Sequence, residues 1–97
     1  MRIDKFLWCI RFYKTRSLAT EACKKNHVKI DQVPLKPAKE VFGGERITIR
    51  ENQINHLIEV LEIPQNRVGA KLLELYRRDL TPKGEFENQE ALKYAQD

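Results

Sequence analysis

The residues of this sequence best suited to binding chemistry are cations gathered near its N-terminus. The segment RFYKTRSLATEACKK, residues 11–25, holds five Lys or Arg residues and a single Glu. Residues 1–50 carry a net charge of +7, whereas residues 51–97 carry a net charge of −3. This polarised distribution favours a polyanionic partner bound by the N-terminal half. The alternative is that the lysines and arginines form a solvated surface that only keeps the protein in solution.

A helix is predicted over the first ten residues, because apolar residues recur there at i, i+3, i+4 and i+7. Arg2, Lys5 and Trp8 would point away from this apolar face. Trp8, Phe12 and Tyr13 are candidates for stacking on unpaired nucleic-acid bases. Core packing is an equal alternative for Phe12 and Tyr13. The apolar face consists of Ile3, Phe6, Leu7 and Ile10.

A second helix is predicted over residues 16–25. Thr15 is a suitable N-cap for it, and Asn26 tolerates the left-handed backbone conformation that ends a helix. The N-terminus of such a helix offers free backbone N–H groups and the positive end of its dipole, which suit a phosphate group. At 100° per residue the helix has one apolar and one polar side. The expected buried residues are Leu18, Ala19, Ala22 and Cys23, and the expected exposed residues are Arg16, Thr20 and Lys24.

After Asn26 the apolar period changes from 3.6 to 2, which predicts short strands. Residues 28–30 and residues 46–50 alternate as half-buried strands do, and residues 56–63 have apolar groups on both faces. The two prolines in the segment DQVPLKPAK, which begins at residue 31, indicate a turn and an irregular edge. A further short strand is expected to begin at Val41, and the sequence GGE after it predicts a turn.

The C-terminal third predicts a helix and then a tail. Val68, Leu72, Leu75 and Tyr76 have helical spacing up to about residue 80, and residues 83–97 are polar and acidic. A chain of 97 residues makes one small domain. The order of its elements is typical of an α+β fold without βαβ alternation. We expect a two-helix hairpin packed on a small antiparallel sheet of three to five short strands, plus a C-terminal helix.

Known catalytic and metal-binding patterns are missing from the sequence. It has no GxSxG, P-loop, GxGxxG or HExxH motif. Cys9 and Cys23 stand alone on apolar helix faces, as small core residues do, and His27 and His56 have no catalytic partners nearby in sequence. We therefore expect no enzyme activity, no cofactor and no metal. Short apolar runs and a charged start predict a cytoplasmic protein with no membrane partner.

If both helices turn their apolar sides inward, the cations converge on one exposed surface with the loop that follows the first strand. Such a surface could neutralise several phosphates of a nucleic acid. A DNA-binding regulator that places the second helix in a major groove is an alternative, and a protein–protein adaptor is another. The candidate binding residues are Arg2, Lys5, Arg11, Lys14, Thr15, Arg16, Lys24, Lys36 and Lys39.

These residues also resemble a known family. The segments RIDKFLW, RFYKTRSLA, HVKI, KPAKEV and GERITI occur in order at the spacing of the S4 RNA-binding domain, and most resemble the stand-alone heat shock protein 15 family. The resemblance covers residues 2–49. It implies an alpha-L motif, in which the helix pair and its loop bind structured RNA. In that family the partner is ribosomal RNA of a free large subunit that still carries peptidyl-tRNA, in a rescue or recycling setting.

The sequence departs from the family at three places. Asn26 stands where Gly is common, Asp31 and Gln32 replace Asn-Gly and predict a longer or looser turn, and an acidic tail replaces a basic extension. We expect residues 1–50 to form the RNA-binding core, residues 51–82 to complete the same domain, and residues 83–97 to form the tail. Ribosomal RNA, with tRNA as a further candidate, is the expected partner of a monomer.

Overall fold

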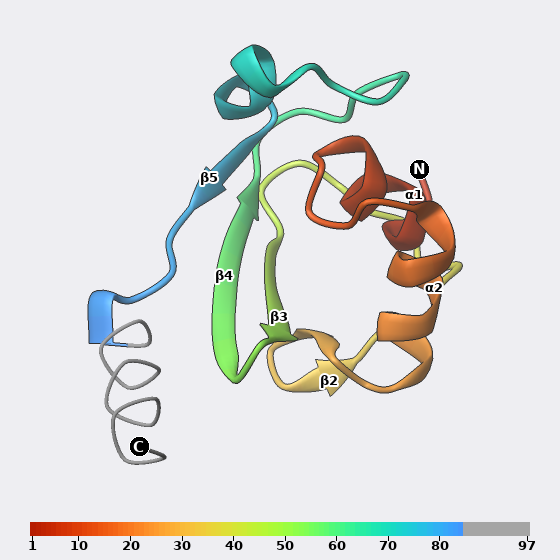
Figure 1. Cartoon of the computed structure of the whole chain (residues 1–97), viewed down its shortest axis with the longest axis vertical. Helices are drawn as coiled ribbons and strands as arrows, with labels where there is room; N and C mark the ends of the chain where they lie inside the picture. Colours follow the sequence, from red (N-terminus) through yellow and green to blue (C-terminus); the bar gives the residue numbers. More distant parts are fainter. Residues whose placement is uncertain (85–97) are drawn as a thin grey trace.

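The computed structural model describes residues 1–84 and has two layers (Figure 1). Two helices cover one face of a five-stranded antiparallel sheet of strand order β2-β1-β3-β4-β5, so the expected α+β architecture with a small antiparallel sheet is confirmed. None of the helices in this part of the chain is long and apolar enough to cross a membrane. The elements are α1 (Ile3–Cys9), α2 (Arg16–Lys24), β1 (Val28–Ile30), β2 (Val33–Pro34), β3 (Arg46–Glu51), β4 (Ile54–Val60), the 3-10 helix η1 (Ala70–Leu75) and β5 (Arg77–Asp79).

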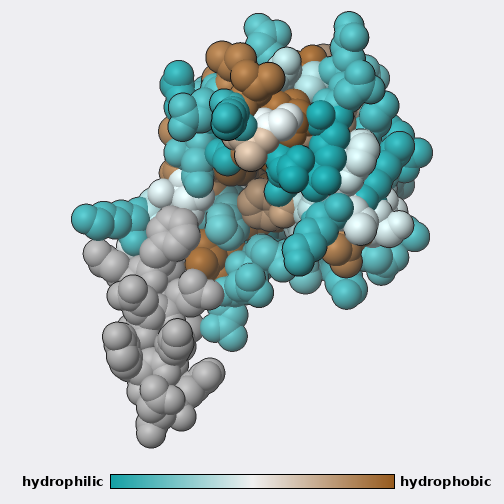
Figure 2. Space-filling view, turned by 45° about the horizontal axis from the view of Figure 1, so that its top comes forward, coloured by the Kyte–Doolittle hydropathy of each residue, from teal (hydrophilic) through white to brown (hydrophobic). Residues whose placement is uncertain are grey.

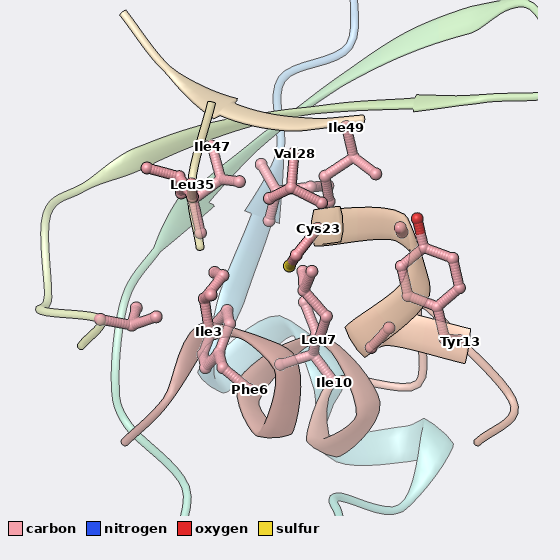
Figure 3. Close-up of a cluster of buried hydrophobic side chains, with 14 of the residues drawn as sticks. Ile3, Phe6, Leu7, Ile10, Tyr13, Cys23, Val28, Leu35, Ile47 and Ile49 are labelled. Atoms are coloured by element: carbon pink, nitrogen blue, oxygen red, sulfur yellow. The ribbon is translucent and has the colours of Figure 1, made fainter. Parts of the chain in front are cut away.

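The core lies between the helices and the sheet. On the face seen in Figure 2, hydrophilic side chains surround separate hydrophobic patches, because most apolar residues face inward. All four residues of the predicted face are fully buried, three of them on α1 and Ile10 at its C-cap, and Figure 3 shows Ile3 and Leu7 pointing from α1 toward the sheet. They meet Val28 of β1 and Ile47 and Ile49 of β3, where alternate residues are buried as predicted. Each such aliphatic side chain contributes roughly 1.5–3 kcal/mol by burial.

The apolar side of α2 is smaller than expected, because Leu18 is 50% exposed. Ala19, Ala22 and Cys23 are buried as predicted. The buried positions centre on Ala19, and Leu18 lies about 100° from it around the helix axis, at the border of the face. Small side chains therefore make the contact between α2 and the core. Burial raises the pKa of the Cys23 thiol to about 11, so this thiol stays protonated at neutral pH.

The hairpin between β1 and β2 has a tight two-residue turn, so the expectation of a looser loop is wrong. Asp31 and Gln32 have φ angles of 49° and 66°, and Ile30 pairs directly with Val33. Positive φ at both central positions is the geometry of a type I′ turn, which matches the twist of the flanking strands. Asn26 has a φ angle of 62° and ends α2 in the left-handed conformation, as predicted.

The helix predicted from Val68 to about residue 80 is not confirmed. This segment forms the six-residue 3-10 helix η1 and then β5, which pairs with β4 at the edge of the sheet. Leu72 and Leu75 are exposed, so the apolar stripe does not face the core along its whole length. The carbonyl of Tyr76 accepts a hydrogen bond from the Leu61 amide at 2.9 Å, and this pairing directs the chain along the sheet.

Two other boundaries differ from those expected. The strand expected over residues 56–63 starts at Ile54 and ends at Val60. Val41 is buried but belongs to no strand; its amide donates to the carbonyl of Met1 at 2.9 Å, beside an isolated bridge between Arg2 and Glu40. The predicted tail lies outside the described residues from position 85 onward.

Candidate nucleic-acid interface

A buried carboxylate connects the two helices and orients two of the candidate cations. Asp4, in the first turn of α1, is only 1% exposed. Its Oδ1 and Oδ2 accept hydrogen bonds from Nε and Nη2 of Arg2 at 3.2 and 3.0 Å, and Oδ2 also accepts one from the Thr20 hydroxyl at 3.0 Å. Nη2 of Arg16 lies 3.6 Å from Oδ1. Asp4 therefore holds both guanidinium groups at the junction of α1 and α2.

These two arginines remain available to a ligand. The side chains of Arg2 and Arg16 are 51% and 44% exposed, although each is paired with Asp4. A guanidinium group has five N–H donors in a fixed plane, so each arginine keeps donors that point to solvent. The three groups together carry a net charge of +1. The buried carboxylate fixes the geometry of the two arginines without neutralising both of them.

The N-terminus of α2 has the predicted cap. Thr15 has an extended backbone, and its Oγ1 accepts a hydrogen bond from the Leu18 amide at 3.1 Å. Lys14, Thr15 and Arg16 are all exposed here. A helix start with exposed cations on both sides of the cap combines side-chain charge with free amide groups, which is the arrangement that phosphate groups favour.

We expect Thr15→Ala to lower the free energy of unfolding by about 1 kcal/mol, because an amide of the first turn of α2 loses its acceptor. For a domain of this size the melting temperature should fall by roughly 4–8 °C, which thermal denaturation followed by circular dichroism can measure. Ser17→Ala, at a neighbouring exposed position, is the control and should change the melting temperature little. Equal stability of the two variants would contradict the role of Thr15.

The segment after β2 adds lysines beside both helices. The amide of Ile3 donates to the carbonyl of Lys39 at 2.7 Å, so this segment runs beside the start of α1 and brings Lys39 close to Arg2. Nζ of Lys39 forms an ion pair with Glu45. Lys36 shares a shallow hollow with Lys24 at the end of α2.

Two further candidates lie on α1 or just after it. Lys5 is half-buried on α1. Burial raises the pKa of the nearby Cys9 thiol, and the charges of Lys5, Arg16 and Arg67 partly oppose this effect. Arg11 instead extends toward the loop before η1, where its Nη1 donates to the carbonyl of Val68 at 3.5 Å. We call the remaining candidates, which lie on the two helices, at the cap of α2 and on the segment after β2, the cationic surface. It consists of Arg2, Lys5, Lys14, Thr15, Arg16, Lys24, Lys36 and Lys39.

Arg67, which no sequence pattern marks, fixes the loop between the helices. Its Nε donates to the carbonyl of Trp8 at 3.2 Å and its Nη2 to the carbonyl of Tyr13 at 3.4 Å. The guanidinium carbon also lies 5.4 Å from the centre of the Trp8 ring, within the range of a cation–π contact. The contact joins residues more than 50 positions apart, so only the tertiary fold could reveal it.

The aromatic candidates for base stacking separate into two groups. The Tyr13 ring is buried, and burial followed by the nearby charge of Glu51 raises the pKa of its hydroxyl. Phe12 is half-buried and packs edge-on against Tyr13 and His56, with ring centres 5.1 and 5.2 Å apart. Phe12 and Tyr13 thus support the core. Trp8 remains partly exposed beneath Arg67.

Comparison with known proteins supports the resemblance seen in the sequence. Residues 1–47 match the model of the S4 domain. The chain is 34% identical over 96 residues to a heat shock protein 15 homologue of Aeromonas salmonicida, which covers 97% of this chain and 73% of that protein. Other heat shock protein 15 sequences are matched over only 57% and 53% of their own length. The chain is also 38% identical over 77 residues to the RQC P-site tRNA stabilizing factor of Helicobacter pylori, covering 78% of this chain and 92% of that factor.

The fold agrees as well. The trimeric structure of Vibrio cholerae heat shock protein 15 superposes with a TM-score of 0.79 and 33% sequence identity, covering 94% of this chain and 90% of that one. A shared fold at this identity, together with the extended match to the Aeromonas salmonicida homologue, shows common descent rather than a local motif alone. The chain belongs to the heat shock protein 15 family.

Proposed function

We propose that this protein is a non-catalytic RNA-binding protein that recognises structured ribosomal RNA through the cationic surface. Its site of action would be a free or stalled large ribosomal subunit that carries peptidyl-tRNA, in a rescue or recycling process linked to heat shock. The observation that carries the proposal is the pairing of Arg2 and Arg16 with one buried carboxylate, which orients two half-exposed guanidinium groups at the same helix junction.

The mechanism would be electrostatic attachment combined with recognition of shape. The deep, narrow major groove of an RNA duplex offers side chains little readable sequence, so a rigid array of cations reads the positions of phosphates instead. Arginine suits this role, because its planar guanidinium group can bind a phosphate through two parallel hydrogen bonds. The N-terminus of α2 would add amide donors beside Arg16. The same surface has no sequence preference of its own, so the folded shape of the RNA would provide specificity.

The relatives support the cellular setting of the proposal. One of them is named for stabilising a tRNA in the P site during ribosome quality control, which makes tRNA a second candidate ligand here. Because ribosomes lie in the cytoplasm, the proposed activity would take place there. The Vibrio cholerae relative was solved as a trimer, whereas a monomer on each subunit is the simpler prediction for this chain.

Sedimentation of tagged protein from cell lysates through a sucrose gradient tests the proposal. We expect the protein to migrate with free large subunits at low salt and to leave them as the salt concentration rises. Migration with small subunits, or in fractions that hold only soluble RNA, would contradict the proposed site of action. Purified large subunits mixed with the purified protein provide the control, because they remove other proteins that could bridge the two.

A further inference from the structure

Phe42 is a large apolar side chain that the structure leaves at the surface. Its side chain is 60% exposed, although the preceding residue, Val41, is buried in the core. Single exposed apolar residues are common and need no special role. Phe42 differs from them because its backbone is fixed on both sides and because it adjoins the cationic surface.

The turn that carries Phe42 is held by several hydrogen bonds. The Phe42 amide donates to Oε1 of Glu45 at 2.7 Å, and the Glu45 amide donates back to the carbonyl of Phe42 at 3.3 Å. The Gly44 amide donates to the carbonyl of Val60 at 2.7 Å, which ties the turn to the end of β4. Gly44 has a φ angle of 91°, a conformation that a residue with a side chain rarely adopts. The ring therefore projects from a preorganised loop.

The charges around this turn compensate one another. Glu45 pairs with Lys39, and Glu40 pairs with the amino group of Met1 at 3.4 Å. Burial alone would raise the pKa of Glu45, but the hydrogen bonds from Lys39 and the Phe42 amide outweigh burial and lower it, so the carboxylate stays ionised near neutral pH. Because the charges of this turn are already paired, a phosphate group would gain little binding free energy there. An uncharged part of a ligand, such as a base, suits it better.

The ring lies at the border of the cationic surface. The Phe42 segment runs antiparallel to the first residues of the chain, because Arg2 and Glu40 form a bridge and the Val41 amide donates to the carbonyl of Met1. Nζ of Lys39, itself part of the cationic surface, lies 5.8 Å from the centre of the ring. An RNA whose phosphates contact Arg2 would therefore have a nearby base within reach of Phe42.

We infer that Phe42 is a stacking site for an unpaired RNA base that lies next to the phosphates held by the cationic surface. The inference rests on the proposed function and adds the class of RNA, namely a structured RNA with a bulged or looped-out nucleotide. Bases inside a duplex are stacked on each other, so only an unpaired base can present its face to a protein ring. Stacking on an aromatic ring tolerates any base.

The test compares two RNA hairpins that differ only by one bulged adenosine. We expect Phe42→Leu to bind the bulged hairpin about tenfold more weakly than the unchanged protein, since the loss of one stacked base has about this effect. Binding of the fully paired hairpin should not change. Phe42→Tyr keeps an aromatic ring and should retain the preference for the bulge. Because no charge is removed, the salt dependence should be the same for all three proteins.

A fluorescent base gives a second readout. When 2-aminopurine replaces the bulged adenosine, its emission should fall on binding to the unchanged protein and to Phe42→Tyr, but not to Phe42→Leu. Equal affinity of Phe42→Leu and the unchanged protein for the bulged RNA would overturn the inference, and so would loss of ribosome co-sedimentation without loss of RNA affinity, which would assign the ring to a protein contact. Failure of the unchanged protein to bind either hairpin in a salt-dependent way would instead contradict the proposed function.

Discussion

Replacement of Lys14, Arg16 and Lys24 together by Gln is expected to weaken the binding of structured RNA about a hundredfold at physiological salt. All three side chains are exposed on the cationic surface, at the start and the end of α2. If each contact with a phosphate contributes about 0.9 kcal/mol, near the upper limit for an exposed ion pair, the three together account for the hundredfold change. The fold should persist, because none of the three side chains is buried and Arg2 still pairs with the buried carboxylate of Asp4 after Arg16 is replaced.

The salt dependence of binding identifies the cause of this loss. Each phosphate contact releases condensed counterions, so the slope of log K against log salt should fall by about 2 to 2.7 when three contacts are lost. Titrations between about 50 and 200 mM salt can measure this difference. The matched control replaces Lys29, Arg50 and Arg78 by Gln.

This control removes the same charge from the opposite face of the sheet. Lys29 and Arg50 alternate along their strands with the buried residues Val28 and Ile49, and Arg78 pairs across the strands with Glu59. The control variant should keep most of the affinity, because its charges lie away from the helix junction. Equal losses in both variants would show that RNA responds to total charge and not to the cationic surface.

The local elements of this fold could be predicted because each depends on residues close in sequence. The face of α1 follows from four apolar residues at helical spacing, the start of α2 from the hydroxyl of Thr15, and its end from the tolerance of Asn26 for a left-handed backbone. The strand β3 follows from the alternation around Ile47 and Ile49. In each case local preference and burial favour the same structure, which is why a single sequence suffices.

The sequence predictions fail where contacts between distant segments decide which of two structures, equally favoured locally, is formed. The spacing of Val68, Leu72 and Leu75 fits a helix, but pairing with the edge of β4 takes the chain into β5 after a short η1. Leu18 is apolar and is therefore expected on the buried side of α2. Only the small residues of α2 contact the core, and Leu18, at the border of that side, is exposed. Helical spacing of apolar residues predicts that a segment has an apolar face, but it does not predict which other segment packs against that face.

The same limit applies to the candidate site. The cationic candidates can be selected from the sequence, because lysine and arginine side chains are usually exposed whatever they pack beside. The structural role of Asp4 cannot be predicted in this way, since an acidic residue in the first turn of a helix usually lies at the surface and stabilises the helix dipole. Its burial depends on Thr20 and Arg16, which come from another helix. Arg67 and the ring of Phe42 depend in the same way on segments that are distant in sequence.

Asp4→Asn is expected to lower the free energy of unfolding by about 2 kcal/mol. Removal of one partner from a fully buried ion pair costs about 3–5 kcal/mol, but Arg2 and Arg16 are about half exposed, so water can solvate them once the carboxylate is gone. The melting temperature should fall by roughly 8–16 °C. Urea denaturation measures the free energy directly. Glu21→Gln is the control, because Glu21 is exposed and pairs with Lys24 at 3.9 Å, and it should change stability by less than about 0.5 kcal/mol.

RNA binding by the same variant distinguishes between two roles of Asp4. If the carboxylate acted only through its charge, its removal would strengthen the attraction of a polyanion, and Asp4→Asn would bind RNA more tightly. If it positions Arg2 and Arg16, its removal lets both side chains rotate, and the entropy of fixing them again must be lost on binding. We expect the second outcome, a loss of severalfold in affinity at a temperature where the variant is folded. Tighter binding would show that the network of Asp4 stabilises the helix pair without shaping the cationic surface.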